Sequence, residues 1–159
     1  MKKLLISGLL LLLIIFGFAT IALGAESDNV TGGPGLGIPY GIIGGNLEVG
    51  FLDYFAVCAG LGLSPEGLGW CIGGRIYLAG SDSRVRPRLG YYRGIVGAVE
   101  YAWNEYEDVK GNAAGLGMLI RINDRISIDG ELIYIASWDY PDEEPDSRYK
   151  ISVGARFAL

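Results

Sequence analysis

The C-terminal residues 149–159 constrain the fold more than any other part of this chain. Every second residue from Tyr149 to Leu159 is apolar or aromatic, and the residues between them are small or polar. Because successive side chains of a strand point to opposite faces, the segment predicts a strand with one apolar face and one polar face. Chain ends usually fray, so an apolar face that reaches the last residue is unusual in a soluble domain. It is typical of a closed barrel in a membrane.

The N-terminal residues have the three parts of a secretory signal peptide. Two lysines precede a mostly apolar run at 4–19, and small residues follow at 22–25. This order predicts export and cleavage close to Ala25. The alternative is an uncleaved anchor, because the apolar run and the small residues together are just long enough to cross a bilayer as a helix. The predicted organisation is a signal peptide at 1–25, a loose N-terminal segment at 26–37 and a barrel at 38–159.

Composition restricts the partners and the chemistry of the chain. Its formal net charge of -5 argues against nucleic acid as a partner. It has no histidine, which rules out a serine–histidine catalytic arrangement, and its two cysteines alone do not make a zinc site. Asp129 and Glu131 share a strand face, but neighbouring cations predict ion pairing for them instead of acid–base catalysis. We therefore expect no enzymatic activity, no metal and no cofactor.

Alternation with period two continues along the mature chain and predicts seven strands. They are expected at 38–51, 55–63, 70–78, 85–103, 114–122, 126–138 and 149–159. Trp138 is expected on the outward face of its strand. Short links at 52–54, 80–84 and 123–125 alternate with links that are mostly longer, at 64–69, 104–112 and 139–148. Membrane barrels have this asymmetry, with short periplasmic turns and longer outer loops.

An eighth strand is required, because single-chain bacterial barrels use even numbers of strands. Either the glycine-rich segment 30–40 supplies it, or the overlong segment 85–103 hides a break, and we favour the first interpretation. The predicted fold class is therefore all-β. The fold is an antiparallel up-and-down transmembrane barrel of about eight strands, seven of them clear, preceded by a signal peptide.

The C-terminus resembles the insertion signal of outer-membrane barrels, in which a polar residue, a glycine and two apolar residues stand at the spacing of Ser152, Gly154, Phe157 and Leu159. The usual last residue of that signal is Phe, whereas this chain ends in Leu159. The mature chain is also similar in size and pattern to the small eight-stranded outer-membrane proteins of the OmpA, OmpX and OmpW type. This resemblance implies an outer-membrane location, with the lipid bilayer and the outer-membrane assembly machinery as partners. It implies little about activity.

Charged residues occur on the faces of the predicted strands that also carry most of the glycine and serine. They are Glu48, Arg75, Arg86, Arg88, Arg121, Asp129, Glu131, Lys150 and Arg156. Side chains just fill the interior of an eight-stranded barrel, and buried charges need partners. We favour a structural ion-pair plug over an ion pathway or narrow pore. Arg121 and Arg156 are expected to pair with Glu48, Asp129 or Glu131.

Three further features are candidates for a structural or binding role. Cys58 and Cys71 point inward on neighbouring strands, where they form a disulfide or remain two buried thiols. The acidic loop at 139–148 is a calcium candidate, although a solvated loop is favoured. Aromatic residues near the strand ends predict a girdle at a membrane interface. They are Tyr54, Trp70, Tyr91, Tyr101, Trp103, Tyr134, Trp138, Tyr140 and Tyr149.

Together these patterns predict an outer-membrane β-barrel protein with a structural, adhesive or narrow-pore role and no catalysis. The competing class is a soluble exported barrel, similar to the lipocalins, that binds a small apolar ligand. The two classes differ in which face of the barrel is apolar. No motif indicates a particular small-molecule ligand.

Overall fold

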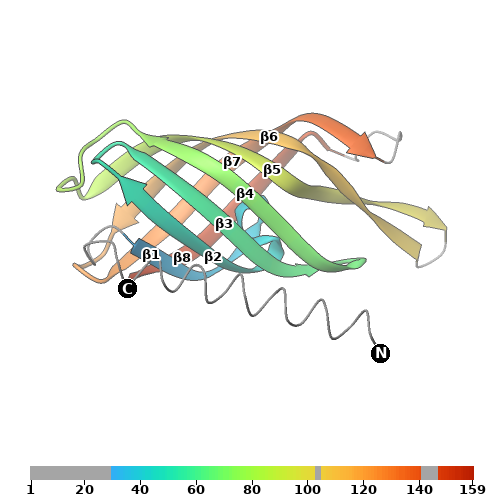
Figure 1. Cartoon of the computed structure of the whole chain (residues 1–159), viewed down its shortest axis with the longest axis horizontal. Coiled ribbons are helices and arrows are strands. Elements are labelled where there is room, and N and C mark those ends of the chain that lie inside the picture. Colours follow the sequence, from blue (N-terminus) through green and yellow to red (C-terminus); the bar gives the residue numbers. More distant parts are fainter. Residues whose placement is uncertain (1–29, 103–104, 141–146) are drawn as a thin grey trace.

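Eight antiparallel strands, paired in the order of the sequence, form a closed barrel (Figure 1). The computed structural model describes residues 30–102, 105–140 and 147–159, and the predicted signal peptide lies outside them. The strands are β1 (Val30–Gly37), β2 (Ile42–Phe51), β3 (Phe55–Ser64), β4 (Gly67–Tyr77), β5 (Val85–Ala102), β6 (Glu105–Arg121), β7 (Ile126–Tyr140) and β8 (Tyr149–Ala158). A 3-10 helix, η2 (Ile38–Tyr40), lies between β1 and β2.

The glycine-rich segment supplies the eighth strand, which confirms the first of the two interpretations. β1 pairs with β2 over its whole length, and on its other side it pairs with β8, where Gly35 lies opposite Gly154. This second pairing closes the barrel. We call the end of the barrel that contains Val30 and Leu159 the terminus end, and the opposite end, from which β5 and β6 project, the hairpin end.

Alternation separates the barrel into an apolar exterior and a largely polar interior. In β8, Ile151 and Val153 are exposed, whereas Ser152 and Arg156 between and beyond them are buried. Each of the eight strands exposes at least one large apolar side chain. These side chains on the strands are Leu36, Ile43, Phe51, Phe55, Val57, Leu61, Leu63, Leu68, Trp70, Ile72, Ile76, Val85, Leu89, Tyr91, Leu116, Met118, Ile120, Ile126, Ile128, Leu132, Tyr134, Tyr149, Ile151, Val153 and Phe157.

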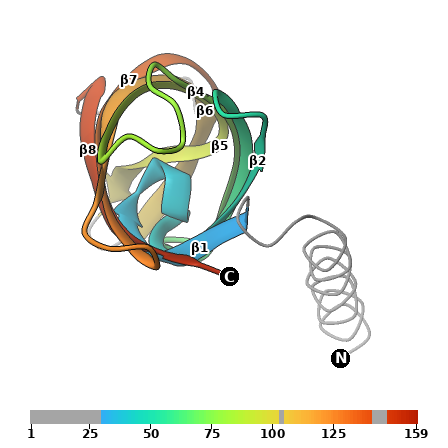
Figure 2. The same ribbon diagram turned by 90° about the vertical axis from the view of Figure 1, so that its left-hand side faces the viewer.

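The connection between β1 and β2 folds into the lumen from the hairpin end. All three residues of η2 are buried, and Figure 2 shows the helix inside the ring of strands. The chain leaves η2 through Gly41, whose φ of 63° lies in the left-handed region that glycine adopts at little cost. The prediction of one strand over 38–51 is therefore wrong at its start, because β2 begins only at Ile42.

The predicted loop at 104–112 is also wrong, because β6 begins at Glu105 and pairs with β5 along its length. The polar residues of this segment concealed the strand from an argument based on apolar alternation. Register shifts between Ile95 and Gly97 and between Glu100 and Ala102 further interrupt the period. The β5–β6 hairpin projects beyond the other strands in Figure 1.

A second irregularity changes which side chains of β7 point inward. The register between β6 and β7 shifts at Lys110–Gly111 and again at Asn112–Ala113. Trp138 lies between these two shifts and packs against buried residues of the interior, so the prediction that Trp138 faces outward is wrong. A bulge adds a residue to one strand and reverses the alternation beyond it, which a strict period of two does not anticipate.

Candidate functional site in the barrel interior

Three arginines and three carboxylates form an ion-pair network in the middle of the lumen. Arg156 pairs with Glu48 at 2.8 Å and with Asp129 at 2.7 Å. Arg88 pairs with Asp129 and, at 2.8 Å, with Glu131. The third arginine, Arg75, lies 2.5 Å from Glu48. All six side chains are almost completely removed from solvent, and their formal charges balance.

Tyrosine hydroxyls provide further partners for each carboxylate of the network. Tyr40 of η2 donates to Asp129 at 3.0 Å, and Tyr77 of β4 donates to Glu48 at 2.6 Å. The hydroxyl of Tyr92 lies 2.7 and 2.8 Å from the two carboxylate oxygens of Glu131. Each buried carboxylate therefore has both a cation and a neutral donor, which offsets the cost of removing its charge from water.

Asn46 links the network to the inward-folded connection. Its amide nitrogen donates to the carbonyl oxygen of Pro39 at 2.6 Å, and its amide oxygen accepts from Arg156 at 3.2 Å and from Arg75 at 3.4 Å. The position of η2 is thus coupled to that of the two arginines. The sequence did not identify Asn46 or Tyr40 as members of the site. The only signal for Asn46 was its inward position on β2, and the only signal for Tyr40 was its place beside Pro39.

The structure places six of the nine predicted lumen residues in the network and leaves Arg86, Arg121 and Lys150 outside it. Arg121 is half-buried at the terminus end, donates to the carbonyl oxygen of Ser81 and forms no ion pair with any described residue. Lys150 is also half-buried, and no described residue pairs with it. Arg156 pairs as predicted, whereas the prediction for Arg121 is wrong, because β6 carries Arg121 beyond the level of the carboxylates.

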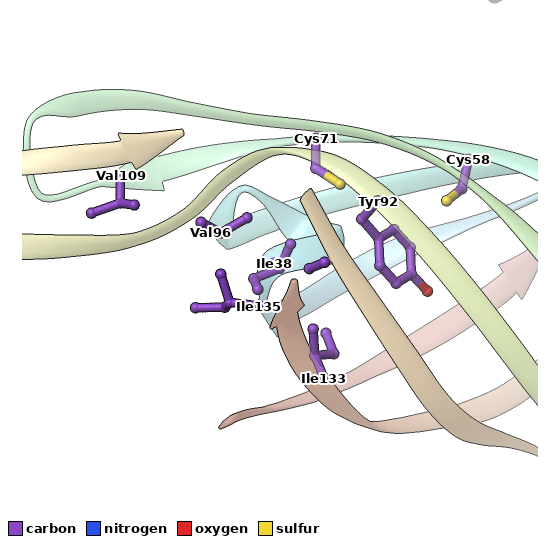
Figure 3. Close-up of a cluster of buried hydrophobic side chains, with 9 residues drawn as sticks. Ile38, Cys58, Cys71, Tyr92, Val96, Val109, Ile133 and Ile135 are labelled. Carbon is purple, nitrogen blue, oxygen red and sulfur yellow. The ribbon is translucent and has the colours of Figure 1, made fainter. Parts of the chain in front are cut away.

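Apolar side chains fill the lumen at the hairpin end (Figure 3). Ile38 of η2 meets residues of β3 to β7 there. The members of the cluster are Ile38, Cys58, Cys71, Tyr92, Val96, Val109, Ala113, Ile133 and Ile135. The β3–β4 turn is fastened to β6 beside them, because Ser64 donates to the carboxylate of Asp108 at 2.5 Å and the amide of Asp108 donates to Glu66 at 3.1 Å. Among the described residues, a packed apolar layer therefore lies between the ion pairs and the hairpin end.

The terminus end holds a cavity of about 420 Å³. Its walls come from the ends of β1 and β8 and from the connections β2–β3, β4–β5 and β6–β7. Five arginines and four carboxylates line it: Arg84, Arg86, Arg121, Arg125, Arg156, Glu48, Asp53, Asp82 and Asp124. In Figure 2, which faces this end, the β4–β5 link crosses over part of the opening.

The two cysteines are buried and free, which is the second of the two alternatives drawn from the sequence. Cys58 lies opposite Gly73 and Cys71 lies opposite Gly60, so the thiols are diagonal neighbours on β3 and β4. Diagonal Cα atoms of an antiparallel pair are about 7–8 Å apart, whereas a disulfide usually needs about 4.4–6.8 Å. This register disfavours a bond without backbone movement.

The C-terminal residues of the resemblance lie on both faces of β8. Phe157 and Leu159 are exposed on the outside of the barrel. Gly154 is directed inward, and a Cβ atom there would collide with the hydroxyl and the adjacent ring carbon of Tyr40. Gly154 is therefore required by the packing of η2, whatever its part in insertion.

The described residues give no sign of a metal site or of a helical membrane span. No group of three or more Cys, Asp or Glu side chains in the described ranges is arranged to hold a metal ion. Of the predicted calcium loop, Asp139 pairs with Arg93 on the outer wall, and residues 141–146 lie outside the described residues. No helix among the described residues is long and apolar enough to cross a membrane.

Searches against known protein families, curated proteins and solved structures found no match to this chain. Its function must therefore be argued from the barrel itself.

Proposed function

We propose that this protein is an outer-membrane β-barrel whose lumen is plugged, with a structural or adhesive role in the cell envelope. The observation that carries the proposal is the inversion of polarity between the two faces of the barrel. Large apolar side chains are exposed on all eight strands, while three ion-paired arginines occupy the interior. A continuous apolar exterior of this kind is costly in water and is stable in lipid.

The height of the apolar exterior supports a membrane-spanning role. Its exposed apolar positions run from Phe55 to Leu63 on β3 and from Tyr149 to Phe157 on β8, nine residues each. A tilted strand needs about 9–11 residues to cross the hydrocarbon core. The equal span on two separate strands supports an apolar belt of even thickness.

Two parallel rows of residues mark an upper limit for this belt on β5 to β8. Tyr91, Tyr134 and Tyr149 are exposed and lie in one row, joined by the pairing of Tyr91 with Ala114 and of Ala114 with Tyr134. The next outward-facing row toward the hairpin end is polar and contains Arg93, Asn112 and Ser137. An aromatic row followed by a polar row is the arrangement expected where hydrocarbon gives way to head groups.

The competing hypothesis, a soluble lipocalin-like carrier, requires an apolar cavity inside a polar exterior. Here the cavity is lined largely by charged and hydroxyl side chains, and the apolar side chains of the lumen are packed together at the hairpin end. The distribution of polarity therefore favours the membrane protein over the soluble carrier.

The narrow-pore alternative is disfavoured by two successive obstructions along the barrel axis. The ion pairs of the middle level are followed by the apolar cluster that contains Ile38, Val96 and Val109. Ions crossing the lumen would have to separate buried charges and then pass a dry layer, and both steps are expensive. A plugged barrel with an external role fits better, and the projecting β5–β6 hairpin is the part that would make adhesive contacts.

Cell fractionation combined with gel mobility tests the proposal. The mature protein should be recovered with outer membranes at native expression, and its band should shift on heating, because folded membrane barrels resist detergent. In planar bilayers the purified protein should give no steady channels. Recovery in the soluble periplasmic fraction would overturn the membrane assignment, and stable wild-type conductance would replace the plug with the pore.

A further inference from the structure

We propose that the cavity at the terminus end is a binding site for a small molecule that carries phosphate or carboxylate groups. The inference rests on the proposed function only for the direction in which the site opens, which is toward the periplasm. At about 420 Å³ the cavity lies within the size range of small-molecule sites. The middle network and the apolar cluster close its inner side, so a ligand enters and leaves by one mouth.

Charges of both signs line the exposed rim of the cavity, whereas deeper inside only positive charges lack an ionic partner among the described residues. The half-buried charges that remain without an ionic partner are positive: Arg86 and Arg121 form no ion pair with any described residue. The carboxylates without cationic partners, Asp53, Asp82 and Asp124, are all exposed at the rim, where water and salt screen them. The interior surface of the cavity is therefore more positive than the balance of its residues indicates.

The two half-buried arginines are held in place by neutral acceptors. Arg86 donates to the carbonyl oxygens of Ala79 and Asp53, at 3.3 and 2.5 Å, and its guanidinium lies 4.0 Å from the centre of the Tyr77 ring. Arg121 donates to the carbonyl oxygen of Ser81. A guanidinium has five N–H donors, so donors remain on both side chains after these bonds are made.

The deeper wall of the cavity has no carboxylate left to neutralise these cations. Glu48 is the acid there, and it is already bound by Arg75, Arg156 and Tyr77. Hydroxyl groups of Thr31 and Ser127 add uncharged donors around the cavity. Guanidinium groups bind planar or tetrahedral oxyanions through paired hydrogen bonds, which identifies the chemical class of the ligand.

Titration of the purified full-length mature protein in detergent micelles tests the site. Inorganic phosphate and succinate are the two probes, and binding is followed by calorimetry and by the amide shifts of Ser81, Ser83 and Ser127. We expect saturable binding of at least one probe, and the probe that binds better identifies the preferred oxyanion. Arg121→Gln should weaken it by about tenfold, the effect of one lost charge-assisted contact.

Two further variants separate a direct contact with the ligand from effects on the fold and on net charge. Arg125→Gln removes a cation from the exposed rim without loosening the β4–β5 link, and it should weaken binding by a smaller factor than Arg121→Gln. Arg93→Gln makes the same change in net charge on the outer wall, far from the cavity, and should bind the probe as the wild type does. The absence of saturable binding to the wild type, or equal weakening by Arg93→Gln and Arg121→Gln, would overturn the proposal.

The outcome is independent of the test of the membrane role, because purified protein binds the probe wherever it resides in the cell. If the protein is found in the outer membrane but binds neither probe, only the proposed binding site is refuted. If the protein binds a probe but is found in the soluble fraction, only the proposed membrane role is refuted.

Discussion

Replacing Arg156 with methionine tests whether the lumen network stabilises the barrel. Arg156 supplies two ion pairs, to Glu48 and Asp129, from a side chain that is 2% exposed. Each hydrogen bond to a charged group contributes about 1.5–3 kcal/mol, and both carboxylates keep another arginine and a tyrosine as partners. We therefore expect a loss of about 3 kcal/mol in the free energy of unfolding, at the lower limit of values for broken buried pairs.

Arg121→Met is the matched control, because it removes the same charge from a half-buried arginine that lies outside the network. It should cost about 1 kcal/mol or less, the contribution of one hydrogen bond to a neutral acceptor. Both losses are measured by equilibrium unfolding in urea with the protein in lipid vesicles, using gel mobility to separate folded from unfolded chains.

A second substitution distinguishes charge imbalance from lost packing. In Arg156→Met the network keeps two arginines and three carboxylates, and adding Asp129→Asn restores the balance. The double variant should therefore lose less stability than the sum of the single losses, with a coupling energy of about 1 kcal/mol or more. Equal losses in Arg156→Met and Arg121→Met, or strict additivity with Asp129→Asn, would refute the reasoning.

Three other substitutions probe the plug, a turn and the terminal strand. Gly154→Ala should destabilise the barrel, because its Cβ meets the Tyr40 ring, and Tyr40→Leu should relieve part of that defect. Gly130→Ala on β7 is the control, because a Cβ there has open space. The free energy of unfolding in urea is the measurement. Leu52→Gly should raise the free energy of unfolding by about 1 kcal/mol, because Leu52 is exposed in the left-handed region with φ of 59°. Phe157→Ser should leave unassembled protein in the periplasm, and normal insertion of this variant would contradict a role of the C-terminus in assembly.

The alternation of the sequence was sufficient to place most of the network. Glu48, Arg75 and Arg88 stand at inward positions of strands whose period is regular, and all three are buried as expected. The period defines the face of a strand but not the depth of a residue along the barrel. Arg121 and Arg156 lie in one cross-strand row through Ser127, yet only Arg156 reaches the carboxylates. Strands of a barrel are tilted, so such a row changes depth along the barrel axis, and alternation does not report this change.

The parts that were not predicted depend on departures from regular pairing. The inward turn of residues 38–40 has no period of its own, so Tyr40 could not be assigned to the lumen. The first part of β6 is polar and the register near Trp138 is shifted, so apolar alternation did not predict the strand pairing there. Backbone hydrogen bonds maintain this pairing without apolar alternation. Backbone pairing is independent of side-chain polarity, which is why a polar hairpin can extend beyond an apolar belt.

Gly154 illustrates how one residue satisfies two separate requirements. The resemblance to an insertion signal and the close approach of Tyr40 both call for glycine at this position, for unrelated physical reasons. Tyr40 in turn binds Asp129, which holds Arg88 and Arg156. The terminal strand, the inward turn and the charge network are thus parts of one packed unit, so the strand that closes the barrel also completes its plug. If Tyr40→Leu relieves the Gly154→Ala defect, the loss of stability arises from this packing, because a defect in recognition of the C-terminus would remain in the double variant.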